Sequence, residues 1–439
     1  MTATDNALGC LALTLALHIA SLANADPSLP PFYEAVTKMK AEGKLGEVIK
    51  KERVTTPIPN AEAWRIAYIS SDMANKKTIS TGMVIAPTGN APTDGRPIIS
   101  WAHGTTGTAQ NCGPSQVENP AVPLNEYFLV SGNSWTDYGV PALAEFIKAG
   151  YVVVASDYQG LGGGGKHQYQ LSATQARDSI DAIRAAGSLK EAGAARKSII
   201  YGWSQGAGAA IAAASSPEYI AREGTAFDGI KVEGFVAMAP PFFRAIAPQG
   251  ALTDASAHAM ISGTLKSFSN SVNNFNHFAM TIWASQAAYP GKLKLTDVFT
   301  DDGAQFIDTI MSNKCVHSAS DTLNYTYGDG FAELVRPDIG NAKAFAETLI
   351  ASAGPDEKPV APVIIFWGTK DIVVPPVMHK IYREHMCRLG GNVTRIQLAG
   401  DKTHFATPAA SQPLYLPWIA DRLAERPAPD GCAAELVQD

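Results

Sequence analysis

A serine at the centre of a glycine-flanked pentapeptide is the strongest chemical signal in this chain of 439 residues. Residues 202–206 read Gly-Trp-Ser-Gln-Gly and fit the pattern G-x-S-x-G. An apolar stretch, Ser198–Gly202, precedes the pattern, and an Ala-rich stretch, Ala207–Ser215, follows it. The glycines allow a tight strand-to-helix turn that would lift the Ser204 hydroxyl above a sheet, at the positive end of a helix. We therefore predict that Ser204 is a nucleophile.

A serine hydroxyl needs a base, and on a fold with this turn the triad follows the chain order serine, acid, histidine. His404 lies in the segment 399–405, Ala-Gly-Asp-Lys-Thr-His-Phe, between the last predicted strand and the last predicted helix. This loop is the expected place of the base. The other histidines after the serine lie in a helix-like stretch or in an insertion: His379, His385, His258, His277 and His317.

The acid is expected where a strand ends between these two residues. Asp371 follows the apolar run Val363–Trp367, and the loops after parallel strands are where functional residues collect. A carboxylate there can accept the second imidazole N–H of His404 and stabilise the imidazolium. Asp401 is the rival, but it stands only three residues before His404, and we interpret it as a loop carboxylate.

A negatively charged tetrahedral intermediate needs backbone donors, which form an oxyanion hole. One donor should be the N–H of Gln205, directly after the nucleophile. The second should come from the loop after the run Pro97–Trp101, which reads His103-Gly104-Thr105. We choose the Thr105 N–H, and His103 and Gly104 remain alternatives.

The run Gly160–Gly165 resembles a phosphate-binding loop only superficially, because it lacks the G-K-[ST] ending. We predict instead a flexible rim near the mouth of the active site. The cysteines form no C-x-x-C pair, so zinc and redox sites are poorly supported. We expect no cofactor and no metal.

The elements that must position these residues alternate along the chain from about Trp64. An opening hairpin (Arg65–Ser70 and Ser80–Ala86) is followed by apolar runs that lack period-2 alternation, as strands covered on both faces do. The predicted strands are Pro97–Trp101, Tyr151–Ser156, Ser198–Gly202, Val232–Ala239, Val363–Trp367 and Thr394–Leu398. The predicted helices are Val140–Ala149, Ala173–Ala186, Val377–Leu389 and Gln412–Ala424.

The strand series stops once, between Pro241 and Pro359. This stretch is rich in aromatic residues and holds three helix-like pieces: Gly263–Asn273, Thr296–Ser312 and Asn341–Ala353. We predict an inserted cap at residues 241–358, with most of its aromatics forming its own core. Residues 26–240 and 359–439 would form the catalytic domain, because Ser204 precedes the insertion while Asp371 and His404 follow it.

The first 25 residues resemble a secretory signal peptide. The apolar run Gly9–Leu22 ends in Ala23-Asn24-Ala25, although no Lys or Arg precedes it. Cleavage near Ala25 would make the protein secreted or periplasmic. Four cysteines would remain, and an even number in an exported chain favours two disulfides in any of three pairings. They are Cys112, Cys315, Cys387 and Cys432.

Composition excludes two classes of protein. Hydrophobic residues make up 46% of the chain and charged residues 17%, which excludes a largely disordered protein. The formal net charge is -6 and Lys and Arg do not cluster, so we expect no nucleic-acid partner.

Taken together, these motifs resemble the α/β-hydrolase superfamily and, within it, a bacterial-type relative of the secretory lipase family, in the branch similar to Candida lipase A. The matching stretches are Trp101–Ser115, Val152–Gly162, Gly202–Gly206, Gly368–Pro376 and Ala399–Phe405. Trp203 and Gln205 depart from the fungal pattern, which resembles G-Y-S-G-G. The cap, the part that usually selects the acyl chain, is the poorest match.

The resemblance implies a mostly parallel central sheet with helices on both faces, and a helical lid inserted after the sixth strand. It also implies ester hydrolysis by acyl-enzyme chemistry, secretion and no cofactor. Its disulfide pattern would pair Cys112 with Cys315 and Cys387 with Cys432.

We therefore expect a secreted serine esterase or lipase. An exported peptidase, an acyltransferase and an inactive hydrolase fold that only binds ligands are the alternatives. The substrate would be a small-molecule, lipid or polymeric ester, and the cap could contact a lipid interface transiently. Short-chain, triglyceride, aromatic and polyester substrates all remain open, because each presents the same carbonyl to Ser204.

Overall fold

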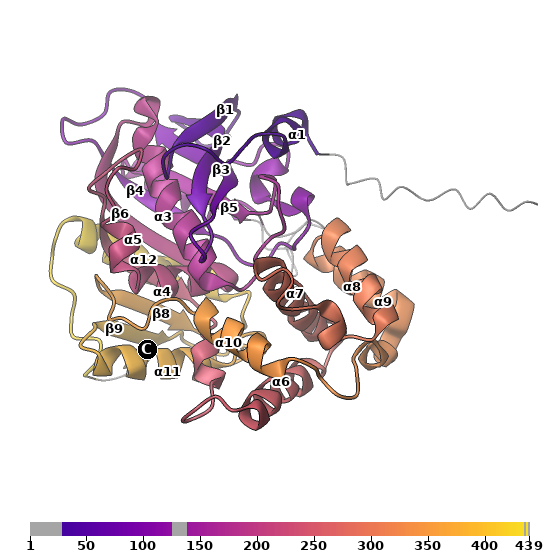
Figure 1. Cartoon of the computed structure of the whole chain (residues 1–439). Helices are drawn as coiled ribbons and strands as arrows, with labels where there is room; N and C mark the ends of the chain where they lie inside the picture. The colour runs from indigo at the N-terminus through magenta and orange to yellow at the C-terminus, as the bar shows by residue number, and fades with distance from the viewer. Residues whose placement is uncertain (1–28, 125–137, 434–435, 438–439) are drawn as a thin grey trace, which may run out of the picture.

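A ten-stranded sheet forms the centre of the protein in the computed structural model, which describes residues 29–124, 138–433 and 436–437 (Figure 1). The signal peptide predicted at residues 1–25 lies outside the described residues. The strand order is β1-β2-β3-β5-β4-β6-β7-β8-β9-β10. The strands are β1 (Val48–Val54), β2 (Ala61–Ser71), β3 (Lys77–Pro87), β4 (Arg96–Ala102), β5 (Val152–Gln159), β6 (Ala194–Trp203), β7 (Lys231–Met238), β8 (Val363–Trp367), β9 (Val393–Gln397) and β10 (Leu436–Val437).

The sheet is antiparallel at one end and parallel from β5 onward. β1, β2, β3 and β5 pair antiparallel, whereas every later pair of neighbours is parallel. The opening hairpin predicted from the sequence is confirmed as β2 and β3. β1 was not predicted, because its residues Lys50–Arg53 are charged and an edge strand exposed to solvent needs no apolar run.

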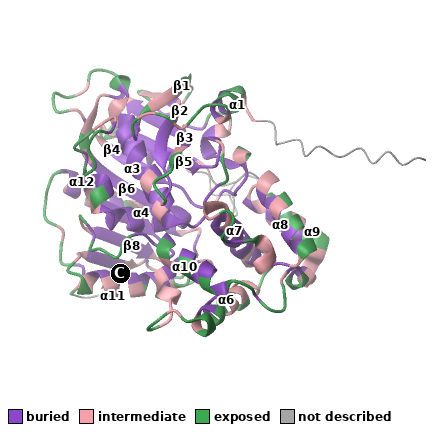
Figure 2. Cartoon of the chain, viewed as in Figure 1, coloured by how far each residue is buried: buried purple, intermediate pink, exposed green. Residues whose placement is uncertain are grey.

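Helices cover both faces of the sheet, as predicted. One face packs against α3 (Ser172–Ser188) and α4 (Gln205–Ala214), and the other packs against α2 (Leu143–Lys148) and α12 (Thr407–Leu423). Neighbouring residues of one strand enter opposite cores: Ile98 of β4 packs on the α3 side and Ile99 on the α12 side. Burial on both faces explains why the strand sequences lack alternation (Figure 2). The remaining helices outside the insertion are α1 (Pro31–Thr37), α5 (Pro217–Ile220) and α11 (Pro376–Arg388).

Five helices lie between β7 and β8 and gather on one side of the molecule (Figure 1). They are α6 (Asp254–Phe268), α7 (Val272–Ala288), α8 (Asp301–Asn313), α9 (Val316–Tyr327) and α10 (Ala342–Ser352). The prediction of one helical piece at Gly263–Asn273 was wrong, because α6 ends and α7 begins within it. Ser271 makes the break: its side chain accepts a hydrogen bond from the Asn274 N–H and caps α7.

Within the described part of the chain, no helix combines the length and apolar character needed to cross a bilayer.

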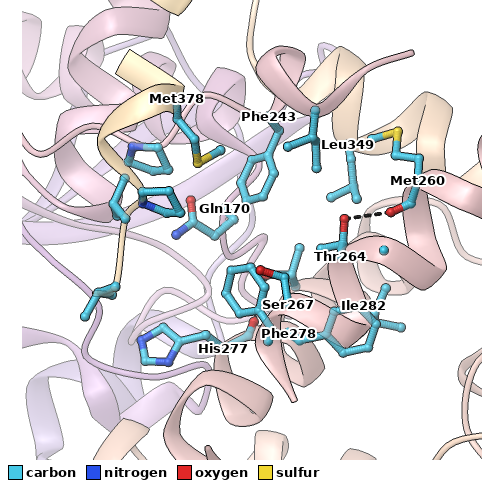
Figure 3. Close-up of a pocket in the computed structure, with 18 of the residues that line it drawn as sticks. Gln170, Phe243, Met260, Thr264, Ser267, His277, Phe278, Ile282, Leu349 and Met378 are labelled. Atoms are coloured by element: carbon cyan, nitrogen blue, oxygen red, sulfur yellow. Dashed lines mark hydrogen bonds between the residues drawn. The ribbon is translucent and has the colours of Figure 1, made fainter. Parts of the chain in front are cut away.

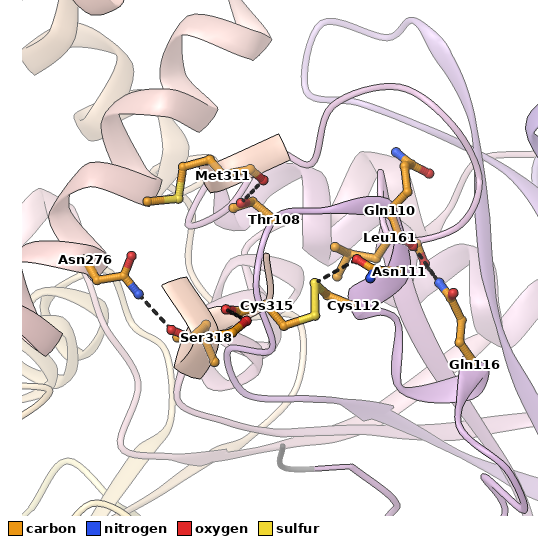
Figure 4. Close-up of a disulfide and its surroundings, with 11 residues drawn as sticks. Thr108, Gln110, Asn111, Cys112, Gln116, Leu161, Asn276, Met311, Cys315 and Ser318 are labelled. Carbon is orange, nitrogen blue, oxygen red and sulfur yellow. Dashed lines mark hydrogen bonds between the residues drawn. A yellow bond between two sulfur atoms is a disulfide. The ribbon is translucent and has the colours of Figure 1, made fainter. Parts of the chain in front are cut away.

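Two disulfides fasten distant parts of the chain. Cys112 pairs with Cys315, and Cys387 pairs with Cys432, which is the pairing that the family resemblance implies. The first joins the loop after β4 to the connection between α8 and α9 (Figure 4). Two hydrogen bonds strengthen the same junction: the Val316 N–H donates to the Thr106 carbonyl (2.9 Å), and the Thr108 hydroxyl donates to the Met311 carbonyl (2.7 Å). The helices of the insertion are thus tied to the sheet at this loop.

The disulfides should differ in their contribution to stability. Cys112–Cys315 closes a sequence separation of 203 residues and Cys387–Cys432 one of 45. Loop-closure entropy grows with loop length, so the Cys112→Ser/Cys315→Ser variant should lose about 1 kcal/mol more unfolding free energy than Cys387→Ser/Cys432→Ser. Urea unfolding of both variants measures this. Equal losses of unfolding free energy, or a larger loss in Cys387→Ser/Cys432→Ser, would show that local packing and not loop closure sets each disulfide's contribution to stability.

Candidate active site

Ser204 occupies a strained turn between β6 and α4. Its backbone has φ 55° and ψ -120°, a conformation that residues other than glycine rarely adopt. The flanking glycines make the turn possible, because a Cβ on Gly202 would lie 2.3 Å from the Gly206 carbonyl oxygen. A Cβ on Gly206 would lie 1.9 Å from the Ala102 carbonyl oxygen. Any larger residue would therefore push α4 away from β4, and the turn would be lost.

The structure brings His404 and Asp371 into direct contact. Nδ1 of His404 lies 2.8 Å from Oδ2 of Asp371, and both side chains are almost fully buried. The other carboxylate oxygen, Oδ1, accepts from the backbone N–H groups of Val373 (2.9 Å) and Val374 (2.8 Å). One carboxylate oxygen of Asp371 therefore accepts two hydrogen bonds from the backbone. The imidazole N–H that faces the other oxygen is fixed at Nδ1.

The loops after β8 and β9 are paired with each other, which explains this contact. The Lys370 N–H donates to the Lys402 carbonyl (2.9 Å), and a Cβ on Gly368 would lie 2.1 Å from the same oxygen. Asp401 points elsewhere: it is exposed and accepts from the Thr369 hydroxyl (3.1 Å). Asp371 therefore contacts His404, whereas Asp401 lies on the exposed side of the paired loops.

Trp203 supports His404 in a way that the sequence did not indicate. Its indole N–H donates to the His404 carbonyl oxygen (3.1 Å), and its ring lies 5.3 Å from the His404 ring. Gly104 lies under the same indole, where a Cβ would come within 2.7 Å of it. The sequence marks Trp203 as a departure from the fungal pentapeptide. A motif does not show, however, which residues the side chain at a variable position contacts.

Of the three residues considered for the second oxyanion donor, Thr105 lies nearest the open site. Thr105 lines a small cavity together with Ser204 and His404. Its hydroxyl is 3.0 Å from that of Tyr169. His103 is buried instead, with its ring nitrogens against the Gly104 and Asp157 carbonyls, and its own carbonyl accepts from the Tyr158 hydroxyl (2.9 Å).

Gln205 is held by a buried histidine. Its side-chain amide lies 3.1 Å from Nε2 of His167, and Nδ1 of His167 lies 2.7 Å from the Gln159 carbonyl oxygen. A carbonyl only accepts, so Nδ1 carries the proton and Nε2 accepts from the amide of Gln205. Burial lowers the pKa of His167 to about 3, which keeps the ring neutral and suits this arrangement.

A larger, mainly apolar cavity of about 350 Å³ opens beside Ser204 (Figure 3). Its lining comes from the inserted helices and from the loops after β7 and β8. Large apolar side chains dominate: Phe243, Met260, Phe278, Ile282, Leu349 and Met378. Some aromatics of the insertion therefore border a cavity, while others, such as Phe275 and Phe299, are buried in its core.

The glycine run Gly160–Gly165 is not among the residues that line either cavity with Ser204. It wraps around the side chain of Gln110, whose Oε1 accepts from the N–H groups of Gly162 (3.2 Å) and Gly164 (3.0 Å). The prediction of a rim at the active-site mouth finds no support in this position. The loop instead braces the segment that contains Cys112.

His277 was set aside in the sequence as a histidine of the insertion, yet it lines both cavities with Ser204. Position along the chain could not reveal this, because it depends on how α7 packs. Among the described residues, no group of three or more His, Cys, Asp or Glu side chains is arranged to ligate a metal.

A mostly parallel sheet, a strained serine turn after β6, and an acid–histidine pair from the loops after β8 and β9 define an α/β-hydrolase. Solved structures agree with this class. Candida antarctica lipase A in its closed state aligns with a TM-score of 0.67 at 17% identity, over 93% of this chain and 89% of that one. The rice cell wall degrading esterase LipA from Xanthomonas oryzae aligns with a TM-score of 0.63 at 20% identity, over 87% and 99%.

Sequence comparison gives the family. The secretory lipase family matches residues 133–431. Lipase 9 of Candida albicans is 24% identical over 445 residues, covering 96% of this chain and 88% of that protein. The secreted triacylglycerol lipase LIP4 of Malassezia globosa is 23% identical over 443 residues, covering 96% and 87%. The chain belongs to the secretory lipase family and is a carboxylic ester hydrolase.

The neutral state of His167 makes a testable contribution to acid sensitivity. Its folded pKa of about 3 lies below the unfolded value near 6.5, so the unfolded chain binds the extra proton first as pH falls. Stability from this group is complete above about pH 6.5 and is lost progressively toward pH 3. The advantage of the wild type over His167→Gln should therefore shrink by about 2 kcal/mol between pH 7 and pH 4.5.

Urea unfolding at the two pH values measures that difference. His258→Gln is the matched control, because His258 is half-exposed on α6. Its stability difference from the wild type shows, at each pH, the effect of removing an imidazole from the surface of α6. A His167→Gln difference that is equal at pH 7 and pH 4.5 would contradict a neutral, buried His167.

Proposed function

We propose that this enzyme hydrolyses carboxylic esters through an acyl-enzyme intermediate, with Ser204 as nucleophile, His404 as base and Asp371 as the acid that orients it. Oγ of Ser204 attacks the ester carbonyl while Nε2 of His404 takes the hydroxyl proton. The backbone N–H groups of Gln205 and Thr105 hold the tetrahedral oxyanion. His404 then donates its proton to the departing alcohol, and the acyl group remains on Ser204.

Water completes the reaction by the same route in reverse. His404 takes a proton from water, the resulting hydroxide equivalent attacks the acyl carbon, and the carboxylic acid leaves as Ser204 regains its proton. The observation that carries the proposal is the buried 2.8 Å contact between His404 and Asp371, beside a cavity that Ser204 and His404 both line. That arrangement places a base with a fixed tautomer at the same cavity as the serine that it would activate.

The larger cavity supports a fatty acyl substrate. About 350 Å³ of mainly apolar space next to the nucleophile can hold an alkyl chain, and its walls come largely from residues 241–358. We propose that this segment is a cap that selects the acyl chain, on a catalytic domain formed by residues 26–240 and 359–439. Ile372, with 83% of its surface exposed, and Val377, with 55%, flank the acid loop and would suit transient contact with a lipid surface.

We also propose that the protein acts outside the cytoplasm. The relative from Malassezia globosa is described as secreted, and two disulfides persist best in oxidising compartments. The leader at residues 1–25, with cleavage near Ala25, is the expected export signal.

The triad can be tested with three variants. Ser204→Ala should reduce hydrolysis of a p-nitrophenyl ester by about a million-fold and abolish labelling by a fluorophosphonate probe. Asp371→Asn should reduce kcat by about ten-thousand-fold, because the amide favours the wrong imidazole tautomer. Asp401→Asn is the matched control for the acid and should stay near wild-type activity, since within the described part of the chain the Asp401 side chain contacts just the exposed Thr369 and Lys370.

Persistent probe labelling of Ser204→Ala would remove Ser204 as nucleophile. A loss in Asp401→Asn as large as that in Asp371→Asn would remove the assignment of the acid. Absence of both probe labelling and ester turnover in the wild type would instead favour an inactive binding protein.

The cap can be tested through Gly263 of α6, which lines the larger cavity. A Cβ at this position would meet no atom within 4 Å, so a large side chain can enter the cavity without displacing the helix. Gly263→Trp should lower kcat/KM for decanoate esters about tenfold or more while butyrate esters are affected much less. An acyl-length series measures this, with Gly330→Trp as control, because a Cβ on Gly330 would meet no atom closer than 3.6 Å and Gly330 lines neither cavity with Ser204. A uniform loss at every chain length would contradict an acyl site here.

A further inference from the structure

The larger and the smaller cavity meet at three residues. Ser204, His277 and Val373 line both of them. Because Ser204 carries the attacking oxygen, the scissile ester must lie at this junction. Thr105 and His404 line the smaller cavity and are not among the residues that line the larger one. The departing alcohol takes its proton from His404, so the alcohol lies on the smaller side and the acyl chain on the larger side.

The two sides differ in size and in the residue types that line them. The acyl side is walled mainly by apolar groups such as Phe243, Phe278 and Met378 (Figure 3). The alcohol side has a volume of about 20 Å³, little more than the space that one water molecule needs. Most of its lining residues are polar: Thr105, Ser204, Asn273, His277, His317 and His404. A compact alcohol fits this space better than a long alkyl alcohol does, and a polar group on it can bond to one of these side chains.

His277 offers a hydrogen-bond acceptor at the junction. Its Nδ1 lies 2.8 Å from the Asn273 carbonyl oxygen of the same helix, so Nδ1 carries the proton and Nε2 has a free lone pair. Within the described residues, Nε2 has no hydrogen-bond partner, although the ring lines both cavities. Burial, with a smaller contribution from nearby His404, lowers the pKa of His277 and favours the neutral ring.

We propose that His277 is a specificity-determining residue whose Nε2 accepts a hydrogen bond from a free hydroxyl on the alcohol part of the ester. The substrate class is then fatty acyl esters of small polyols that keep a hydroxyl next to the ester oxygen. This inference rests on the acyl-enzyme mechanism proposed above, because Ser204 and His404 define which side holds the alcohol. It adds a residue from the cap that recognises the leaving group.

The test compares 2-hydroxyethyl octanoate with propyl octanoate, which have the same number of heavy atoms and differ in one hydroxyl group. One hydrogen bond should give the wild type about a fivefold to tenfold higher kcat/KM for the hydroxyethyl ester. His277→Phe keeps a ring without an acceptor and should reduce this ratio to about 1. His277→Gln, which retains an acceptor, should restore part of it. His277→Leu replaces the phenylalanine variant if that protein does not fold.

His258→Phe in α6 is the matched control, because His258 lies in the cap but lines neither cavity. It should retain the wild-type ratio. A wild-type ratio near 1, or equal losses for both esters in His277→Phe and His277→Leu, would overturn the role of His277 while leaving the triad intact. Absence of hydrolysis of both esters, together with absence of fluorophosphonate labelling, would overturn the proposed function itself.

Discussion

The active site depends on how closely α4 can approach β4. The Ala102 carbonyl lies where a side chain on Gly206 would have to be, and Ala102 pairs with Gly202 in the parallel register of β4 and β6. This contact fixes the strained turn of Ser204 directly beside the loop that begins at His103. The proposed nucleophile and oxyanion donors are therefore positioned by backbone packing, which no rotamer change can relax. A wider spacing would separate them, whatever side chains they carried.

Burial imposes a second condition on the proposed mechanism, because charge that develops on His404 would have no water to stabilise it. Asp371 supplies the counter-charge, and removing a carboxylate from water costs free energy unless its lone pairs are satisfied. The N–H groups of Val373 and Val374 satisfy one oxygen, and the imidazole satisfies the other. The indole of Trp203 meanwhile holds the His404 backbone. These backbone and indole groups thus hold Asp371 and His404 in a fixed orientation.

The sequence was informative where a single interaction requires one residue type. It was uninformative where tertiary packing accepts many residue types at a position. Doubly buried strands and the glycines around Ser204 leave patterns that periodicity and motif order reveal, so the sheet and the positions of Asp371 and His404 were predictable. β1 was missed because an exposed edge strand tolerates lysine and arginine. The break at Ser271 was missed because one side-chain cap, invisible in composition, decides where α7 begins. His277 looked ordinary because its importance comes from the tertiary position of α7.

The candidate site is built from two parts of the chain, the sheet with its loops and the helices between β7 and β8. The core supplies the reacting groups, while the insertion supplies most of the walls, and the two are joined by the Cys112–Cys315 disulfide and the bond from Thr108 to Met311. These links hold the end of the insertion that adjoins the loop of Thr105, so the spacing between that loop and the nearby wall is constrained covalently. The acyl cavity is bordered instead by α6 and by Leu349 of α10, which lack such a covalent tie. In the proposed mechanism, variation in the substrate can therefore be accommodated on the acyl side more readily than on the alcohol side.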